Sequence, residues 1–238
     1  MNLSEELRNV LSAEGAELIG YGTLTDEICP DYPVGVSVAL SVPLHILNDL
    51  EDGPTKAYYD MYYEWNERLN QIVRAGEQFL IHKGYQALAL TTDAVKIDEE
   101  WKSRLPHKTV ATRSGLGWIG KNGLLVTSEF GPAVRISSIL TDAPLACAQP
   151  VDQSLCGSCS VCRKNCPAQA VKGVLWNTTV PREQIVDVKA CKKKQIELMK
   201  ARTGIESDLC GKCFVVCPYT RKYIKKKTQE MCGTEDIE

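Results

Sequence analysis

The sequence predicts a mixed α/β (α+β) domain over residues 1–150, followed by a small cysteine-rich domain over residues 151–238. Three observations lead to this prediction. Apolar residues alternate with small residues over positions 34–42, a pattern typical of a strand. Residues 55–82 carry apolar side chains at helical spacing, and two runs of cysteine follow residue 150.

In chain order, the first domain is predicted to mix helices with strands. Residues 4–14 read as an amphipathic helix and residues 18–24 as a strand. The strand over 34–42 has one apolar face and one face of Gly, Ser and Ala, which allows a helix or a flat ligand to approach closely. We expect a helix there. Residues 55–82 form the longest helix, whose aromatic stripe we assign to the core, and residues 86–90 form a strand.

The rest of the first domain is predicted to be less regular. Residues 91–105 are polar, and we expect them to form a lid over a site. Residues 124–127 and 134–140 are predicted to be two strands joined by a Gly-Pro turn at 131–132. Residues 141–152 contain two prolines and are predicted to connect the domains.

The two cysteine runs have the spacing of an iron–sulfur protein. Residues 156–167 match C-x2-C-x2-C-x3-C-P, which holds a cubane cluster in bacterial ferredoxins. Residues 210–218 end in the same C-x3-C-P, and Cys191 stands upstream in place of the usual first cysteine. The fourth cysteine of such a run ligates the other cluster. We therefore assign one 4Fe–4S cluster to Cys156, Cys159, Cys162 and Cys217, and a second to Cys166, Cys191, Cys210 and Cys213.

A pair of structural zinc sites is the alternative, because C-x2-C pairs also bind zinc. The C-x3-C-P ending, present twice, favours iron and sulfide. Cys29, Cys147 and Cys232 are left over and are expected to be free thiols.

Composition points to a cytoplasmic globular protein. The hydrophobic content is 44%, no apolar run reaches the length of a membrane span, and the N-terminus shows no signal-peptide pattern. Eleven cysteines in a reducing compartment suit metal binding better than disulfides.

Charge is divided unevenly along the chain. Residues 1–150 hold 12 Lys and Arg against 20 Asp and Glu, a net −8, whereas residues 151–238 hold 16 against 10, a net +6. Two clusters with their thiolates would offset about four of these positive charges. The basic excess is therefore no argument for a nucleic-acid partner by itself.

A glycine-rich segment at residues 114–123 is the second informative stretch. Four glycines lie within nine residues, beside Trp118 and Lys121, and they allow the backbone to approach a large flat surface. Residues 115–120 also match the bare G-x-G-x-x-G pattern of nucleotide-binding proteins, but a lone match is a weak signal.

These motifs together resemble the epoxyqueuosine reductase family, which consists of cobalamin-dependent iron–sulfur proteins distantly similar to reductive dehalogenases. The resemblance rests on His107-Lys108, residues 114–122, residues 141–144 and the cysteine runs. It implies a nitroreductase-like corrinoid-binding domain and a two-cluster bacterial-ferredoxin-like domain. It also implies that the corrinoid lies against His107, Lys108, Gly115, Leu116, Gly117, Trp118, Gly120 and Lys121.

The chain departs from the family in two places. Residues 101–104 lack the family's proposed proton-donating aspartate, and the chain stops at Glu238, before a helical-repeat domain that helps to hold tRNA. We therefore expect a small organic substrate rather than tRNA. His107 is our candidate proton donor, because histidine titrates closest to neutral pH, and a purely structural hydrogen-bonding role is the alternative.

The sequence thus predicts a reductase with two 4Fe–4S clusters and cobalamin. An external low-potential donor, a ferredoxin or a flavodoxin, is expected to dock on the basic stretches 192–194 and 221–227. Two alternatives remain open: an electron-transfer protein or corrinoid-reducing activator without its own substrate, and epoxyqueuosine reduction in tRNA.

Overall fold

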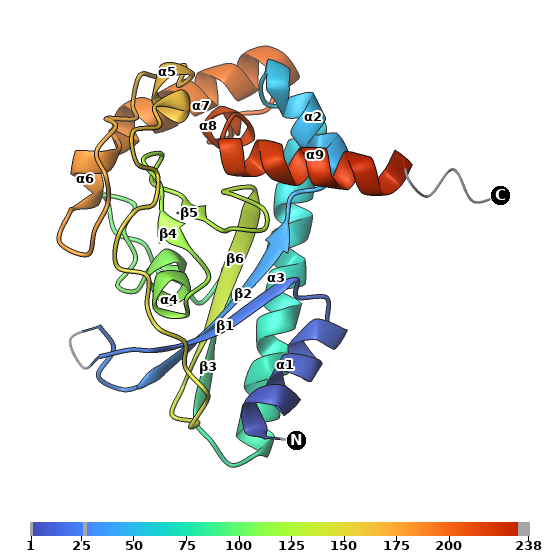
Figure 1. Ribbon diagram of the computed structural model, residues 1–238, viewed down its shortest axis with the longest axis vertical. Coiled ribbons are helices and arrows are strands. Elements are labelled where there is room, and N and C mark those ends of the chain that lie inside the picture. The colour runs from blue at the N-terminus through green and yellow to red at the C-terminus, as the bar shows by residue number, and fades with distance from the viewer. Residues whose placement is uncertain (1, 26–27, 233–238) are drawn as a thin grey trace. The chain divides into compact units, whose positions relative to one another are not determined.

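The computed structural model describes residues 2–25 and 28–232 (Figure 1). The chain divides into two compact units. The first comprises Met1–Ser41, Tyr63–Gly117 and Arg135–Asp152, and the second comprises Val42–Tyr62, Trp118–Val134 and Gln153–Glu238. Residues 42–62 and 118–134 therefore group with the cysteine-rich part of the chain, whereas the sequence predicts contiguous domains.

A four-stranded sheet with the order β1-β2-β6-β3 forms the centre of the first unit. Its strands are β1 (Leu18–Thr23), β2 (Val34–Ser41), β6 (Val134–Thr141) and β3 (Ala87–Leu90). β1 pairs with β2 and β3 pairs with β6, both in antiparallel register. The predicted strands at 18–24, 34–42, 86–90 and 134–140 are all present, so the mixed α/β class is confirmed for this unit.

Helices α1 (Leu3–Ala13) and α3 (Lys56–His82) cover one face of this sheet (Figure 1). Asn2 caps α1 by accepting the N–H of Glu5, whose side chain accepts the N–H of Asn2 in return. The predicted aromatic stripe of α3 contributes to the core: Trp65 packs against it and donates its indole N–H to the Ser41 carbonyl at 2.8 Å.

The small-residue face of the sheet is covered by α4 (His107–Arg113), as expected. A Cβ added at Gly35 would lie 2.6 Å from Val110 Cγ1, and one added at Gly22 would lie 2.4 Å from the carbonyl carbon of Arg113. Glycine is needed at both places because the helix lies directly on the strands. This packing fixes the start of the glycine-rich segment, which follows α4.

The strands predicted at 124–127 and 134–140 are both present, but they do not pair with each other as a hairpin. β5 (Leu125–Val126) pairs with β4 (Trp118–Ile119) in a separate two-stranded sheet of the second unit, and β6 pairs with β3. The reason is the tight turn between β4 and β5, in which the Gly120 N–H donates to the Leu124 carbonyl at 2.8 Å.

The remainder of the second unit consists of helices joined by cysteine-bearing loops. The predicted helix over 185–201 is α7 (Val188–Thr203), which begins after the capping residue Asp187. The other elements are α2 (Leu44–Asp49), η1 (Leu50–Asp52), α5 (Val161–Lys164), α6 (Arg182–Ile185), α8 (Lys212–Val215) and α9 (Pro218–Cys232).

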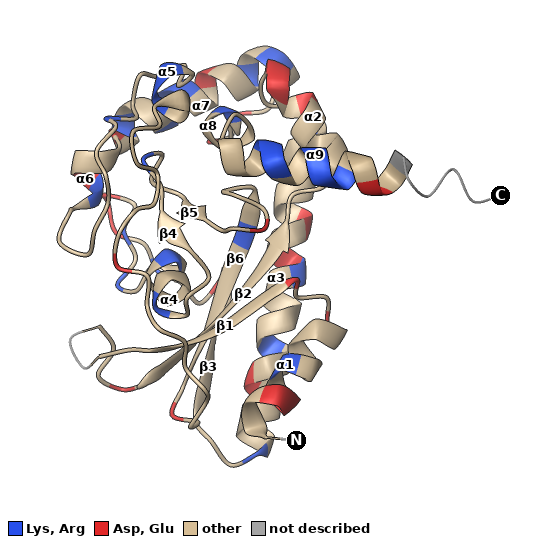
Figure 2. Ribbon diagram, viewed as in Figure 1, with Lys and Arg blue, Asp and Glu red and all other residues tan. Residues whose placement is uncertain are grey.

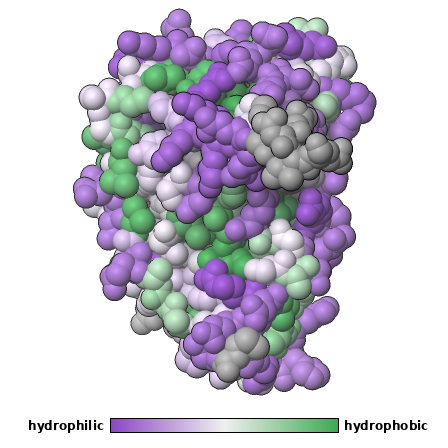
Figure 3. Space-filling view, turned by 45° about the vertical axis from the view of Figure 1, so that its right-hand side comes forward, coloured by the Kyte–Doolittle hydropathy of each residue, from purple (hydrophilic) through white to green (hydrophobic). Residues whose placement is uncertain are grey.

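Among residues 2–25 and 28–232, no helix combines the length and the hydropathy needed to cross a bilayer. Figure 3 shows hydrophilic side chains over much of the visible face, with hydrophobic side chains gathered in patches between them.

Candidate functional site

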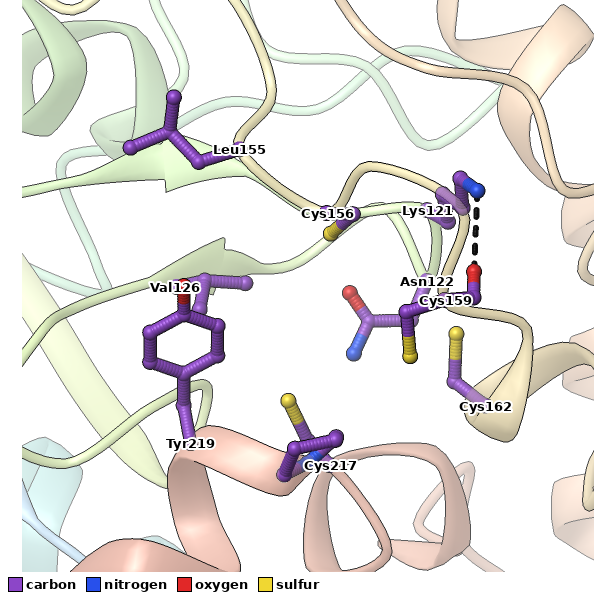
Figure 4. Close-up of a pocket in the computed structure, with 10 residues that line it drawn as sticks. Lys121, Asn122, Val126, Leu155, Cys156, Cys159, Cys162, Cys217 and Tyr219 are labelled. Carbon is purple, nitrogen blue, oxygen red and sulfur yellow. Dashed lines mark hydrogen bonds between the residues drawn. The ribbon is translucent and has the colours of Figure 1, made fainter.

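Four cysteines of the second unit line one cavity of about 160 Å³ (Figure 4). Two come from the loop before α5, one from α5 and one from the residue before α9. They are the set that the sequence assigns to the first cluster: Cys156, Cys159, Cys162 and Cys217. Lys121, Asn122, Leu155 and Tyr219 complete most of the lining.

Local backbone geometry explains why these thiols converge. Gly157 has φ +51°, and the N–H of Cys159 donates to the Cys156 carbonyl at 3.1 Å, which closes a tight turn. Pro218 is the first residue of α9, a position where the fixed φ of proline and its missing N–H are both tolerated. The proline therefore starts the helix and fixes the direction of Cys217.

The other four predicted ligands also lie close to one another in the second unit. Cys191 is in the first turn of α7, and the charges of Cys166 and Cys210 contribute to raising its pKa to about 11, after burial as the main cause. Electrostatic interactions also link Cys213, in α8, to Cys210, Cys191 and Cys166, and to Cys162 of the first group. These interactions fit the set predicted for a second cluster, whose ligands stay a prediction.

Burial is the main cause that raises the pKa of five of these thiols above the ordinary value, namely Cys162, Cys191, Cys210, Cys213 and Cys217. It raises the pKa of Cys162 to about 11, with a further contribution from Cys156, and it also raises the pKa of the fully buried Cys213. Thiols with such pKa values stay protonated at neutral pH unless a positively charged group binds them. Each of the two predicted sets contains such buried thiols, which suits it to hold a cationic metal centre.

The donor set fits a group of several metal atoms. A single zinc ion draws its sulfur ligands to about 2.3 Å. Within the described residues, no three His, Cys, Asp or Glu side chains are arranged to hold one ion, and four of the thiols instead surround an open volume of about 160 Å³. This arrangement fits the cubane cluster predicted from the spacing.

The turn between β4 and β5 carries two polar side chains onto the cysteine loops. The Lys121 ammonium donates to the carbonyls of Gly157 at 2.7 Å and Cys159 at 2.9 Å. Asn122 donates more weakly to the Cys213 carbonyl, at 3.4 Å. The family resemblance implies a corrinoid contact for Lys121, and it includes Asn122 in its motif without giving that residue a role.

The rest of the glycine-rich segment is divided between the units. In the first, Gly115 follows α4 with φ +71°, and Leu116 and Gly117 come next. In the second, Trp118 is 4% exposed and packs edge-on against Tyr219, at 5.0 Å between ring centroids. Gly120 is buried in the turn that follows.

The indole N–H of Trp118 is buried and has no hydrogen-bond partner among the described residues. A buried donor without a partner costs on the order of 1–3 kcal/mol. A ligand that carries acceptor groups, such as the amide side chains of a corrin, would satisfy it. Trp118 is one of the residues for which the family resemblance implies corrinoid contact, and the observation fits that role.

His107 and Lys108 begin α4 and are half-buried. The Nδ1 atom of His107 lies 3.1 Å from Ser138 Oγ. Burial, with a smaller contribution from the positive charge of Arg135, lowers the pKa of His107 to about 4. The imidazole is therefore neutral at pH 7, so a proton could come only from its N–H and not from an imidazolium.

The predicted lid borders a second cavity, of about 330 Å³, which lies within the first unit. Its lining includes Leu88, Leu90 and Leu140, together with Asp31 and, from the predicted lid, Lys96 and Arg104. Residues 94–96 and 103–105 of the irregular stretch thus line a cavity, while their action as a lid stays a prediction.

Comparison with known proteins gives the following relatives. No protein-family model matches the chain. An epoxyqueuosine reductase of Lactococcus garvieae (strain Lg2) is 27% identical over 241 residues, which cover 92% of this chain and 56% of the relative. One of Listeria monocytogenes is 36% identical over 124 residues, which cover 49% of this chain and 30% of the relative. The chain thus spans 56% or less of the length of these two relatives.

Solved structures share the fold. A catabolic reductive dehalogenase has a TM-score of 0.74 at 17% identity, covering 93% of this chain and 33% of its own. The epoxyqueuosine reductase of Streptococcus thermophilus has a TM-score of 0.58 at 19% identity, covering 93% of this chain and 67% of its own. The mixed α/β fold predicted from the sequence is therefore confirmed.

Proposed function

Because this chain is a relative of the epoxyqueuosine reductases, we propose that it is a cobalamin-dependent iron–sulfur reductase. The observation that carries the proposal is the convergence of four thiols on one cavity, with a second group of four in the same unit. In this proposal, the cysteine-rich part from residue 151 to residue 238 acts as a two-cluster, ferredoxin-like domain. Residues 1–150, with the nitroreductase-like fold that the resemblance implies, bind the corrinoid.

The cysteines supply the ligands for two 4Fe–4S clusters in this proposal. Bound clusters would pass single electrons to a corrinoid, which supplies the reducing chemistry toward a carbon–heteroatom bond. The chain's own residues hold the loops in place and restrict access of water. Val126 and Tyr219 form apolar parts of the cavity wall, while Leu155 stands at its edge and is 57% exposed.

Corrinoid binding is assigned to the segment from Gly115 to Gly120, with His107 and Lys108 at the start of the preceding helix, because the Lys121 ammonium is held by carbonyls of the cysteine loop. The buried indole N–H of Trp118 supports the assignment, because it would find an acceptor there. One structural neighbour is described as a reductive dehalogenase whose structure suggests a mechanism for B12-dependent dehalogenation, and this agrees with the same cofactor.

A small organic substrate is favoured by the cavity of the first unit, whose volume of about 330 Å³ is in the usual range for ligand sites. The leucines that line it suit a compact organic molecule, and Asp31, Lys96 and Arg104 could make polar contacts with such a molecule. Reduction of epoxyqueuosine in tRNA is the second candidate. The names of the relatives favour it, and so does a structural neighbour solved with an epoxyqueuosine-modified tRNA stem loop.

Electrons are proposed to come from an acidic low-potential donor, a ferredoxin or a flavodoxin. Figure 2 shows Lys and Arg along α7 and α9. Several of these cations already pair with carboxylates, such as Arg221 with Glu51. Lys193, Lys222 and Lys225 are exposed and form no ion pair within the part of the chain that the structure describes, so they are available to a partner.

Anaerobic purification followed by analysis of iron, sulfide and cobalt tests the proposal. We expect about eight iron and eight sulfide per chain, and one cobalt after incubation with cobalamin. Clusters without any cobalamin binding would favour the electron-carrier alternative. Stoichiometric zinc without sulfide would contradict the proposal altogether.

A further inference from the structure

The β4–β5 turn holds a buried cation against the first group of cysteines. Lys121 is 8% exposed and lines the same cavity as Cys156, Cys159, Cys162 and Cys217 (Figure 4). Its ammonium group donates to two carbonyls of the loop that carries three of these thiols, at 2.7 Å and 2.9 Å.

The turn that presents Lys121 is rigid. The Asn122 side-chain oxygen accepts the N–H of Leu124 at 3.2 Å, in addition to the Gly120 hydrogen bond described above. Gly123 has φ +74°, and a Cβ there would lie 3.0 Å from Val186 Cγ2. The turn thus fixes the backbone at Lys121, and the two loop carbonyls hold its ammonium at the cysteine loop.

The charge of Lys121 is not neutralised by a neighbouring carboxylate. Its hydrogen-bond partners are neutral carbonyls, and no ion pair of Lys121 occurs among residues 2–25 and 28–232. The negative charge that can balance this cation at the cavity is that of the thiolates and of the group they hold. A fixed positive charge favours the state of that group with one more electron.

We propose that Lys121 raises the reduction potential of the first cluster and positions the loop that binds it. This inference rests on the proposed function, because it assumes that a 4Fe–4S cluster occupies the cavity. Each cluster takes up one electron from the external donor. The inference assigns Lys121 to the first cluster, whereas the family resemblance implies that it faces the corrinoid. A difference in potential between the two clusters gives electron transfer between them a preferred direction.

The test is a redox titration of anaerobically reconstituted protein, followed by electron paramagnetic resonance. At an effective dielectric constant of about 20, a unit charge within roughly 12 Å of the cluster changes a one-electron equilibrium constant by at least roughly tenfold. We therefore expect Lys121→Met to lower the reduction potential of the first cluster by at least about 59 mV, which is a tenfold change in the ratio of reduced to oxidised cluster at a given potential. The second cluster should shift much less.

Lys172→Met is the matched control. Lys172 also donates to a backbone carbonyl, that of Glu183 at 2.6 Å, but it is exposed and does not line the cavity. The control removes the same charge at a site screened by water, so neither potential should change appreciably. Equal shifts in both variants would show that net charge alone is responsible, and would overturn the proposal.

The Lys121→Arg variant keeps the positive charge of the side chain and changes its shape, so it separates the effects of the two. If Arg retains the wild-type potential while Met lowers it, the charge is responsible. If Met loses the iron of the first cluster and Arg keeps it, the positioning role is supported. If Arg shifts the potential as far as Met does, or also loses the cluster, the charge assignment is wrong. Absence of clusters from the wild-type protein would instead refute the proposed function, so the two failures can be told apart.

Discussion

Replacing Gly22 tests whether the packing of α4 against the sheet positions the segment from Gly115 onward, to which we assign corrinoid binding. A Cβ at Gly22 would lie 2.4 Å from the carbonyl carbon and oxygen of Arg113 and 2.5 Å from the Ser114 nitrogen. Ordinary contacts between carbon atoms are about 3.5–4.0 Å, so Gly22→Ala must push the end of α4 away by roughly 1 Å. All three neighbouring atoms belong to the backbone and cannot rotate aside.

We expect this overpacking to cost about 3 kcal/mol, at the upper end of the usual range. For a chain of this size, a loss of about 3 kcal/mol lowers Tm by roughly 6–12 °C. Because Gly115 follows α4 directly, cobalamin binding should weaken as well. Thermal unfolding followed by circular dichroism measures the first effect, and titration with cobalamin at a temperature well below Tm measures the second.

Gly76→Ala is the control for this experiment. A Cβ at Gly76 would lie 2.5 Å from Ile139 Cδ1 and 2.8 Å from Leu11 Cδ2, both of which are ends of side chains. The added methyl also favours the helix by about 1 kcal/mol. The control should therefore melt closer to the wild type. An unchanged Tm and unchanged cobalamin affinity in Gly22→Ala would refute the packing argument.

Four other predictions concern the site. Cys159→Ala and Cys213→Ala should each lose about half of the bound iron, because each removes a ligand of a different cluster; a total loss in either would show that the sites are not independent. Gly117→Val should abolish cobalamin binding without loss of iron, and equal binding would place the corrinoid elsewhere. The pKa of His107 lies below its ordinary value of 6.5, so the contribution of its neutral form to stability is fully present above about pH 6.5 and is lost as the pH falls toward 4. His107→Gln should therefore flatten the dependence of the free energy of unfolding on pH between about 6.5 and 4. An unchanged curve would contradict the lowered pKa of His107. Lys222→Glu should weaken docking of an acidic ferredoxin at low salt and have less effect at high salt, whereas salt-resistant binding of a tRNA stem loop by the wild-type protein would favour the second candidate function.

The convergence of Cys156, Cys159 and Cys162 could be predicted from the sequence because their spacing is a local constraint. These three thiols lie within seven residues of the chain and line one cavity. The strand at 34–42 was equally predictable, since strict alternation marks two faces. Both predictions needed only neighbouring positions in the chain.

Other features depend on contacts between distant segments. β4 and β5 have two residues each, which is too short for any periodicity, so their pairing could not be read from the pattern. The hydrogen bonds of Lys121 reach loop carbonyls 36 and 38 positions away. Residue type alone suggests a pKa near neutrality for His107, whereas its burial lowers the pKa to about 4.

The central claim is that electrons reach a bound corrinoid through clusters held by these cysteines. Stopped-flow visible spectroscopy tests it most directly, with reconstituted protein, bound cobalamin and a reduced ferredoxin as donor under anaerobic conditions. The account predicts that the bound cobalamin is reduced in the wild-type protein, and that reduction slows severely in Cys159→Ala although cobalamin remains bound. Reduction at the wild-type rate in a variant that has lost its first cluster would contradict the claim.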